Sequence, residues 1–254
     1  MSRTLLIVSG GLFLVTTSLN AQTPVRPAPA PAPSAAKPAG PPLPPARPDP
    51  ARVTPYHQSL RMVMARNGQE QEIGRLDDEV TLTQLDGKPA LIRVQNVESP
   101  NGLMTDTAVA DPSNLAPRWH SSHAEHRDLR LQFGPRKVIG TYKASGDPSF
   151  PIDQTVADSL FDSNMLDVLI TALPLTDGYK GRLTVYLYEA GGATPVDVAV
   201  TGSETVAGVE TWNTGVTIAG RTARYYVGKN DRHVVQIVSS PGPGVELRLV
   251  RSGA

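Results

Sequence analysis

Hydrophobic and polar residues alternate over many short stretches of the chain after residue 56. This alternation is typical of antiparallel strands that have one buried and one solvated face. The alternating hydrophobic positions include Leu60, Met62 and Met64; Val80 and Leu82; Leu129, Leu131 and Phe133; Leu183, Val185 and Leu187; and Leu247 and Leu249. The dipeptides Asn67-Gly68, Asp86-Gly87 and Asn101-Gly102, and the run at 241–244, predict tight turns between such strands. The pattern lacks the helical segments between strands that a parallel sheet requires.

One segment, SLFDSNMLDVLITALP at residues 159–174, has the pattern of a helix instead. Its apolar residues cover an arc of the helical wheel that is wider than the stripe of a surface helix. Ser159 and Asp162 resemble a capping box with a shorter acid, and Pro174 cannot continue the helix. Asp162 falls within the apolar arc, but in the first turn, where free backbone N–H groups favour a carboxylate. The sequence therefore predicts one largely buried helix over residues 159–174.

These patterns together predict a mainly β fold. We expect a strongly curved antiparallel sheet, a half-barrel, with the one apolar helix packed on its concave face. A closed barrel or a two-layer sandwich is the alternative, because all three architectures produce the same alternation.

The first 55 residues differ in composition from the rest of the chain. Residues 1–21 combine an early positive charge at Arg3, an apolar run and small residues before Ala21, which is typical of a secretory signal peptide. The alternative is a retained membrane anchor, but the apolar run is shorter than the roughly 20 residues that span a bilayer. Residues 22–55 are rich in Pro and Ala and predict a disordered linker, or alternatively a ligand for a proline-binding domain. We therefore expect export to the bacterial periplasm, no transmembrane span after cleavage, and a single β-rich domain at 56–254.

Composition and missing motifs narrow the chemistry further. The chain has no cysteine, which excludes disulfides, thiolate catalysis, cysteine zinc sites and a lipidated cysteine. Its formal net charge is zero without a basic stripe, and it has no phosphate-binding glycine loop and no G-x-S-x-G motif. Asp77, Asp78 and Glu79 lack the spaced oxygen ligands of a calcium loop and indicate a solvated turn. We therefore expect no nucleic acid, nucleotide or cofactor, and no enzymatic activity.

Three histidines, His120, His123 and His126, recur at three-residue intervals. On a helix they would share one side and could bind zinc or copper, whereas on a strand His120 and His123 point to opposite faces. The segment follows Pro117 and precedes a clear strand, so extended structure is favoured and we predict no metal site. A metal-dependent enzyme built on these histidines is the weakest of the functional alternatives.

Large flexible and aromatic side chains provide the candidate ligand contacts. Most of them are explained by packing in the core, but they can also line a groove for an apolar ligand. The residues predicted to line such a groove are Met62, Met64, Trp119, Phe161, Met165, Leu169 and Trp212.

Several stretches are similar to a known family in order and spacing. They are NLAPRWHSSH at 114–123, RDLRLQF followed by VIGTY, FDSNMLDVLITALPLTDGY at 161–179, and VTGSETVAGVETW at 200–212. Together they resemble the exported bacterial domain-of-unknown-function family 3108, which has no established activity to carry over. The resemblance also implies a relationship to the half-barrel lipoprotein carriers of the bacterial envelope, in which a curved sheet holds acyl chains beneath a helical lid.

The leading hypothesis is a periplasmic, non-enzymatic carrier or sensor of a lipid, an acyl chain or a lipoprotein segment. The alternative is a structural or protein-interaction module of the cell envelope, in which the helix plugs the sheet. A solid core beneath Phe161, Met165 and Leu169 favours the module, and an open apolar pocket there favours the carrier.

Overall fold

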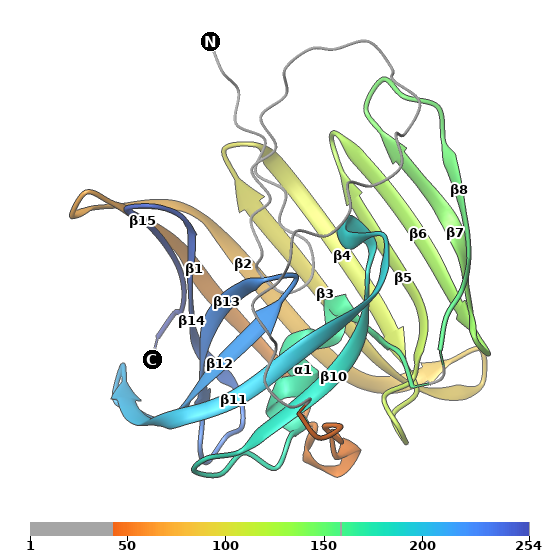
Figure 1. Ribbon diagram of the computed structural model, residues 1–254. Coiled ribbons are helices and arrows are strands. Elements are labelled where there is room, and N and C mark those ends of the chain that lie inside the picture. Colours follow the sequence, from red (N-terminus) through yellow and green to blue (C-terminus); the bar gives the residue numbers. More distant parts are fainter. Residues whose placement is uncertain (1–42, 158, 254) are drawn as a thin grey trace, which may run out of the picture.

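The computed structural model describes residues 43–157 and 159–253. The predicted signal peptide at 1–21 lies outside these residues, as does the predicted linker up to residue 42. The described part consists mainly of strands with one short α-helix (Figure 1), which confirms the predicted mainly β class.

The elements follow one another in a simple order. The first half contains the 3₁₀ turn η1 (Pro50–Arg52) and the strands β1 (Tyr56–Arg66), β2 (Gln69–Leu85), β3 (Lys88–Ser99), β4 (Gly102–Ala110), β5 (Pro117–Ala124), β6 (Arg127–Gly134), β7 (Lys137–Ala144) and β8 (Phe150–Thr155). Then come β9 (Phe161–Asp162), the 3₁₀ turn η2 (Ser163–Met165) and the helix α1 (Leu166–Ala172). The second half contains β10 (Lys180–Leu187), the 3₁₀ turn η3 (Tyr188–Ala190), β11 (Gly192–Val206), β12 (Val209–Ile218), β13 (Arg221–Gly228), β14 (Val234–Gly242) and β15 (Val245–Arg251).

All of these strands belong to one sheet. Its order is β8-β7-β6-β5-β4-β3-β2-β1-β15-β14-β13-β12-β11-β10-β9, so the first and last long strands, β1 and β15, pair at its centre. Every pairing is antiparallel except that of β9 with β10. Within the described residues β8 and β9 end the order without pairing to each other, so the sheet is open rather than a closed barrel.

The predicted turns connect neighbouring strands. Asn67 and Gly68, and Asp86 and Gly87, have positive φ angles, as a two-residue hairpin turn that matches the twist of its strands requires. The Asn101-Gly102 and 241–244 turns also separate paired strands. The structure adds two tight turns without the usual sequence signal, at Ala207-Gly208 and Ala219-Gly220, where alanine takes the first left-handed position. The glycine at the second position of these turns is their only local signal.

The helix is shorter than predicted. Phe161 and Asp162, which we assigned to its first turn, form β9 against β10 instead, and Ser159 has a φ angle of 66° and caps nothing in the helix. Asp162 instead caps the 3₁₀ turn η2 that precedes α1, because its carboxylate accepts a hydrogen bond from the backbone N–H of Asn164. Met165, at the N-cap of α1 itself, makes no side-chain cap. The predicted end is nearly right, because Leu173 is extended as the residue before a proline should be. Pairing with β10 therefore overrode the local helical pattern.

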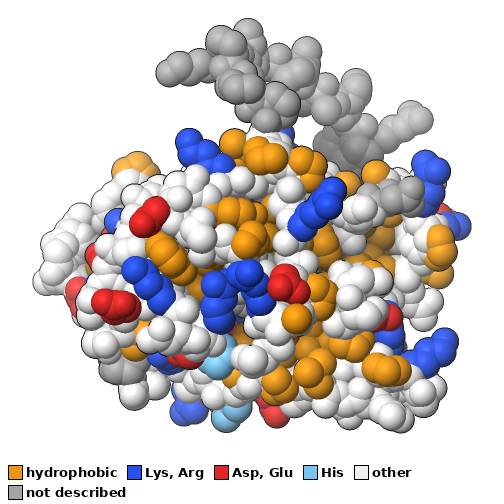
Figure 2. All heavy atoms as spheres, turned by 90° about the horizontal axis from the view of Figure 1, so that it is seen from below, with side chains coloured by type: hydrophobic (Ala, Val, Ile, Leu, Met, Phe, Trp, Pro, Cys, Tyr) orange, Lys and Arg blue, Asp and Glu red, His pale blue; other side chains and the backbone are white. Residues whose placement is uncertain are grey.

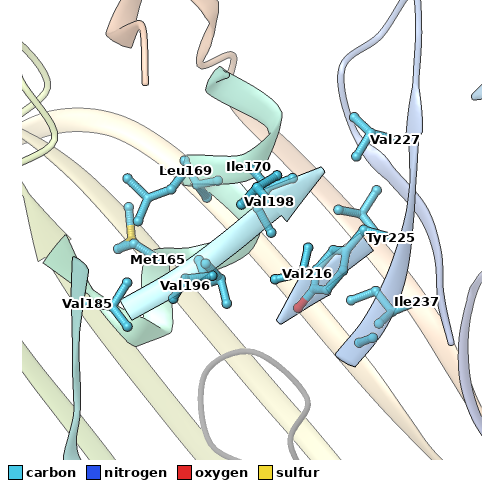
Figure 3. Packing of buried hydrophobic residues seen from close by; sticks show 14 of the residues in the cluster. Met165, Leu169, Ile170, Val185, Val196, Val198, Val216, Tyr225, Val227 and Ile237 are labelled. Atoms are coloured by element: carbon cyan, nitrogen blue, oxygen red, sulfur yellow. The ribbon is translucent and has the colours of Figure 1, made fainter. Parts of the chain in front are cut away.

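The main hydrophobic core combines α1 with strands from both halves of the sheet. All seven residues of α1 are buried. Figure 3 shows Met165, Leu169 and Ile170 beside Val185, Val196 and Val198 of β10 and β11. Strands β1 to β4 and β12 to β15 contribute further residues to the same cluster. The interior around the helix is therefore occupied by side chains.

A second hydrophobic cluster connects the two ends of the sheet, and we call this contact the seam. It joins Leu129, Leu131 and Val138 of β6 and β7 to Tyr186 of β10. The rings of Phe133 and Tyr186 meet edge to face with centroids 5.9 Å apart, and those of Tyr142 and Tyr188 lie 4.7 Å apart. The amide of Gln154 in β8 donates to the Gly191 carbonyl at 3.3 Å. Side chains, rather than a continuous backbone ladder, thus link β6–β8 to β10 and η3.

The last residues of the predicted linker lie against the domain. The N–H of Ala46 donates to the Arg182 carbonyl, the N–H of Arg182 donates to the Pro44 carbonyl, and both distances are 2.8 Å. The N–H of Asp49 donates to the Ala172 carbonyl at 3.0 Å, at the end of α1. Residues 44–49, which precede the expected boundary at residue 56, therefore bond through their backbone to β10 and α1.

Candidate functional site

A buried arginine fixes the helical segment to the sheet. Arg93 of β3 is fully buried, and its Nε and Nη2 donate to the two carboxylate oxygens of Asp78 at 2.8 and 3.0 Å. Its Nη1 donates to the Asn164 carbonyl at 2.5 Å, and its Nη2 also donates to the carboxylate of Asp167 in α1. Because a buried charge without a partner is costly, these contacts fix the position of the helix on β3.

Two tyrosines complete this network. The Tyr56 hydroxyl donates to Asp78 Oδ2 at 2.8 Å, and the Tyr225 hydroxyl is hydrogen-bonded to Asp167. Burial raises the pKa of both phenols well above the ordinary value, and the neighbouring carboxylates raise the pKa further. Both tyrosines therefore remain neutral hydrogen-bond donors. The predicted solvated turn at Asp78 is wrong, since this residue lies within β2 and is a buried partner of Arg93.

A second buried polar cluster holds the start of the helical segment. His120 Nδ1 of β5 lies 3.3 Å from Asp162 Oδ1, and both side chains are buried. Burial opposes protonation of His120, but the charges of Asp162 and Asp106 and the hydrogen bond to Asp162 outweigh it, so the pKa of His120 is raised. Burial raises the pKa of Asp106, and His120 and Arg127 only partly offset this. Arg127 Nη2 donates to Ser122 Oγ at 2.5 Å.

Three atoms of this cluster have no hydrogen-bond partner within residues 43–157 and 159–253. They are His120 Nε2, Asp106 Oδ1 and Asp162 Oδ2. Over the same residues, however, no three histidine or carboxylate side chains are arranged to hold a metal ion. His120 is buried, while the His123 side chain on the opposite face of β5 is 77% exposed. The expected separation of these two histidines is confirmed.

The seven residues predicted to line a groove do not come together. Met62, Met165 and Leu169 are buried inside the main core, where Phe161 and Trp212 pack against its margin. Met64 and Trp119 are only partly buried and are not among the residues of that core. The seven residues come from four strands and from the η2–α1 segment, which lie in different parts of the sheet. Met62 and Met64 are two positions apart in β1, but a register irregularity falls between Met62 and Val63.

One of the seven, Phe161, does border a cavity, which we call the seam pocket. Its volume is about 490 Å³, and it lies between the β4–β5 loop, the β6–β7 hairpin and the segment between β8 and β9. Its lining residues are Asn114, Ala116, Pro117, Phe133, Gly134, Pro135, Arg136, Lys137, Val138, Val156, Ala157, Ser159, Leu160 and Phe161. Phe133, Val138, Val156 and Leu160 also belong to the seam, so the pocket opens onto the second hydrophobic cluster.

A second cavity, the Trp119 groove, lies on β5 and β6 and has a similar volume of about 490 Å³. Most of its lining residues have polar side chains, but Trp119 and Leu131 add apolar surface. The lining residues are Trp119, His120, Ser121, Ser122, His123, Asp128, Arg130, Leu131 and Gln132. Neither the seam pocket nor this groove is lined by Met62, Met165 or Leu169.

Comparison with known proteins identifies the family. The model of the family described as "Protein of unknown function (DUF3108)" matches residues 60–249. The chain belongs to this family. No curated protein matches the chain.

Solved structures from other families are similar to this chain at low sequence identity. A β-barrel-like protein of the domain-of-unknown-function family DUF1849 from Brucella abortus has a TM-score of 0.48 and 11% identity, over 79% of this chain and 96% of its own. A DUF1329 family protein from Desulfovibrio piger has a TM-score of 0.31 and 12% identity, over 80% of this chain and 86% of its own.

The stretches that resemble the DUF3108 family all lie within or overlap the matched residues, and they supply much of the buried polar chemistry. The segment at 161–179 contributes Asp162, Asn164 and Asp167, and the segment at 114–123 contributes His120. The sequence contains no sign of the role of Arg93, and the acidic cluster around Asp78 predicts a solvated turn instead, because the partners of both residues are distant in sequence.

Proposed function

We propose that this chain is an exported, non-enzymatic binding protein that takes up an acyl chain of a lipid or lipoprotein at the seam pocket. The observation that carries this proposal is the position of the pocket. It joins an apolar wall formed by Phe133, Val138 and Leu160 to the second hydrophobic cluster between the ends of the sheet. Its volume lies within the range of about 300–1,000 Å³ that small-molecule sites occupy.

The half-barrel architecture supports this location. In our view the sheet is curved, α1 fills its concave side, and the seam is where the two ends of the sheet approach. Met165 and Leu169 are 2% and 0% exposed, so the space beneath the helix has no room for a ligand. An apolar ligand is therefore proposed beside the helix rather than beneath it, and of the seven predicted contacts we retain Phe161.

Export is proposed from the signal-like sequence at 1–21. In the described part of the chain no helix is long and apolar enough to cross a membrane. We therefore propose a periplasmic location, with the residues before 43 acting as a tether.

A second candidate function is a protein-interaction module of the envelope, and the filled core favours it. The Arg93 network and the packed α1 make the helix a fixed plug, as that hypothesis requires. Figure 2 shows hydrophobic side chains gathered on the face seen from below Figure 1, beside Lys, Arg and acidic side chains. Mixed apolar and charged surfaces of this kind are common where proteins dock.

Native mass spectrometry distinguishes the two functions. The full chain is produced in a bacterial periplasm, purified without detergent, and measured before and after organic extraction. We expect an added mass of one fatty acid or lipid that extraction removes and that added palmitate restores. Bare polypeptide in all three spectra would contradict acyl binding and leave the interaction module as the function to pursue.

A matched pair of variants locates the site. Val156→Gln places an amide in the wall of the seam pocket and should weaken palmitate uptake at least tenfold, because the amide would lose its water in an apolar site. Leu82→Gln makes the same kind of change at an exposed position of β2, which is 49% exposed, and should leave uptake unchanged. Equal uptake by both variants would place the ligand elsewhere.

A further inference from the structure

The Trp119 groove has no role in the proposed function, and the more exposed of its side chains come from the outer face of the sheet. His120 and Ser122 of β5 are buried on the inner face, as are Leu129 and Leu131 of β6. The residues between them therefore face outward. In register across the two strands they are Trp119 opposite Gln132, Ser121 opposite Arg130, and His123 opposite Asp128.

The charges of the groove neutralise one another. Asp128 Oδ2 lies 3.5 Å from His123 Nδ1, and Asp128 Oδ1 lies 3.5 Å from Arg130 Nε. These side chains are 39%, 77% and 76% exposed, so they can also reach a ligand. Because the Asp128 carboxylate is paired with the Arg130 guanidinium, the groove offers no isolated charge for an anion or a cation. Its ligand is therefore expected to be polar and uncharged.

Apolar and polar side chains lie next to one another in the groove and at its edge. Trp119 is partly buried and has Gln132 as its neighbour on β6, and Ile139 of β7, which is 40% exposed, lies opposite Gln132. An indole provides a flat apolar surface, while the amide, guanidinium and carboxylate groups beside it donate and accept hydrogen bonds. A ligand that matches this arrangement has an apolar face and several hydroxyl groups at its edge.

We propose that the Trp119 groove binds a neutral saccharide, with one sugar ring stacked on Trp119 and its hydroxyl groups bonded to Gln132, Arg130 and Asp128. A pyranose ring combines an apolar C–H face with hydroxyl groups around its rim, and it carries no charge. This site is separate from the seam pocket, because the lining residues of the two cavities do not overlap.

Calorimetric titration of the full chain with maltotetraose and with tetra-N-acetylchitotetraose tests this proposal. We expect saturable binding of at least one of them, and a loss of affinity of tenfold or more in Trp119→Ala. Gln132→Ala, which changes an exposed side chain and should fold normally, should weaken binding at least threefold. Gln84→Ala is the matched control, since Gln84 is an exposed glutamine of another strand, and its affinity should equal that of the unaltered chain.

Fluorescence gives an independent measurement, because the chain has two tryptophans. In Trp212→Phe the remaining indole is Trp119, and the bound saccharide should change its emission with the same affinity that calorimetry gives. The proposal is overturned if neither saccharide binds at millimolar concentration, or if Gln132→Ala binds as tightly as Gln84→Ala. Loss of palmitate uptake in Val156→Gln with saccharide binding intact would show that the two sites are independent.

Discussion

Two arginine–aspartate pairs in this protein have the same bidentate geometry but opposite environments. Arg93 and Asp78 join β3 to β2, with side chains 0% and 2% exposed. Arg182 and Asp197 join β10 to β11 at 2.5 and 2.8 Å, with side chains 39% and 35% exposed. In both pairs the residues are 15 positions apart in the chain. Contact geometry alone therefore does not determine how much an ion pair contributes to the free energy of unfolding.

The two arginines differ in the other groups to which their side chains bond. Arg182 bonds through its side chain to Asp197, and water can replace either partner at the surface. Arg93 also neutralises Asp167 and bonds to the Asn164 carbonyl, so its removal leaves two carboxylates in the interior without their cation. The buried pair thus connects the helix to the sheet, whereas the exposed pair only links two neighbouring strands.

The largest effect is expected from Arg93→Met. This change fills similar space but removes the charge, and we expect the free energy of unfolding to fall by about 3–5 kcal/mol because buried carboxylates lose their partner. Urea unfolding followed by circular dichroism measures this loss.

Arg182→Met is the matched control, with an expected loss of about 1 kcal/mol or less. A triple variant, Arg93→Met with Asp78→Asn and Asp167→Asn, extends the comparison. It should recover part of the stability lost in Arg93→Met, because it also removes the two carboxylate charges. If Arg93→Met and Arg182→Met lost equal stability, burial would not be the deciding difference.

An intermediate effect is expected from the titratable pair at the start of the helical segment. The pKa of His120 is raised above its ordinary value of about 6.5 by Asp162 and Asp106. A histidine with a raised pKa in the folded state stabilises the fold below its unfolded pKa, and this contribution is lost as pH rises through the folded value. We therefore expect the free energy of unfolding to decrease as pH rises above about 6.5.

His120→Gln keeps a hydrogen-bond donor near Asp162 but does not titrate, so its stability should vary less over this pH range. His123→Gln, on the exposed face of the same strand, should keep the pH dependence of the unaltered chain. Urea unfolding from pH 5.5 to 8.5 gives both profiles. A dependence that persists in His120→Gln would assign it to another group.

The smallest effect is expected at the other end of the helix. Arg232 Nη2 and Nε donate to the Thr171 carbonyl at 2.8 and 3.1 Å, and Arg232 Nη2 also donates to the Leu173 carbonyl. These bonds satisfy free carbonyls at the helix end, but the side chain is partly exposed, so water can take its place. Arg232→Ala should cost about 1 kcal/mol in urea unfolding. If Arg232→Ala lowered the free energy of unfolding as much as Arg93→Met does, the contacts at the two ends of the helix would contribute equally to stability.

The sequence predicted the mainly β class because strands such as β1 and β6 alternate between exposed and buried residues, and that alternation is local. It predicted the helix but not its start. Phe161 and Asp162 pair with Val185 and Tyr186, and no local pattern encodes a parallel pair with a strand more than 20 residues away. The positive φ angles at Ala207 and Ala219 were also not predicted, because the glycine after each alanine is the only local signal of these turns.

The candidate sites were harder to predict than the fold. Large residues such as Met62 and Leu169 were predicted as ligand contacts, but they fill the core, because size and apolarity are equally suited to both roles. Arg93 interrupts an apolar strand face without any local signal of its purpose. Its partners Asp78 and Asp167 are 15 and 74 residues away in the chain, so only the folded sheet brings the three together.

Native-state hydrogen exchange of the α1 amides tests most directly whether the helix is a fixed plug rather than a moving lid. In that experiment we expect the amides of residues 169–172, which lie in a fully buried helix, to exchange only through global unfolding. Their opening free energy should equal that of the β12 and β13 amides and should fall with it in Arg93→Met. Opening of α1 at a free energy several kcal/mol below that of the sheet would contradict the plug and make the space beneath the helix accessible to ligand.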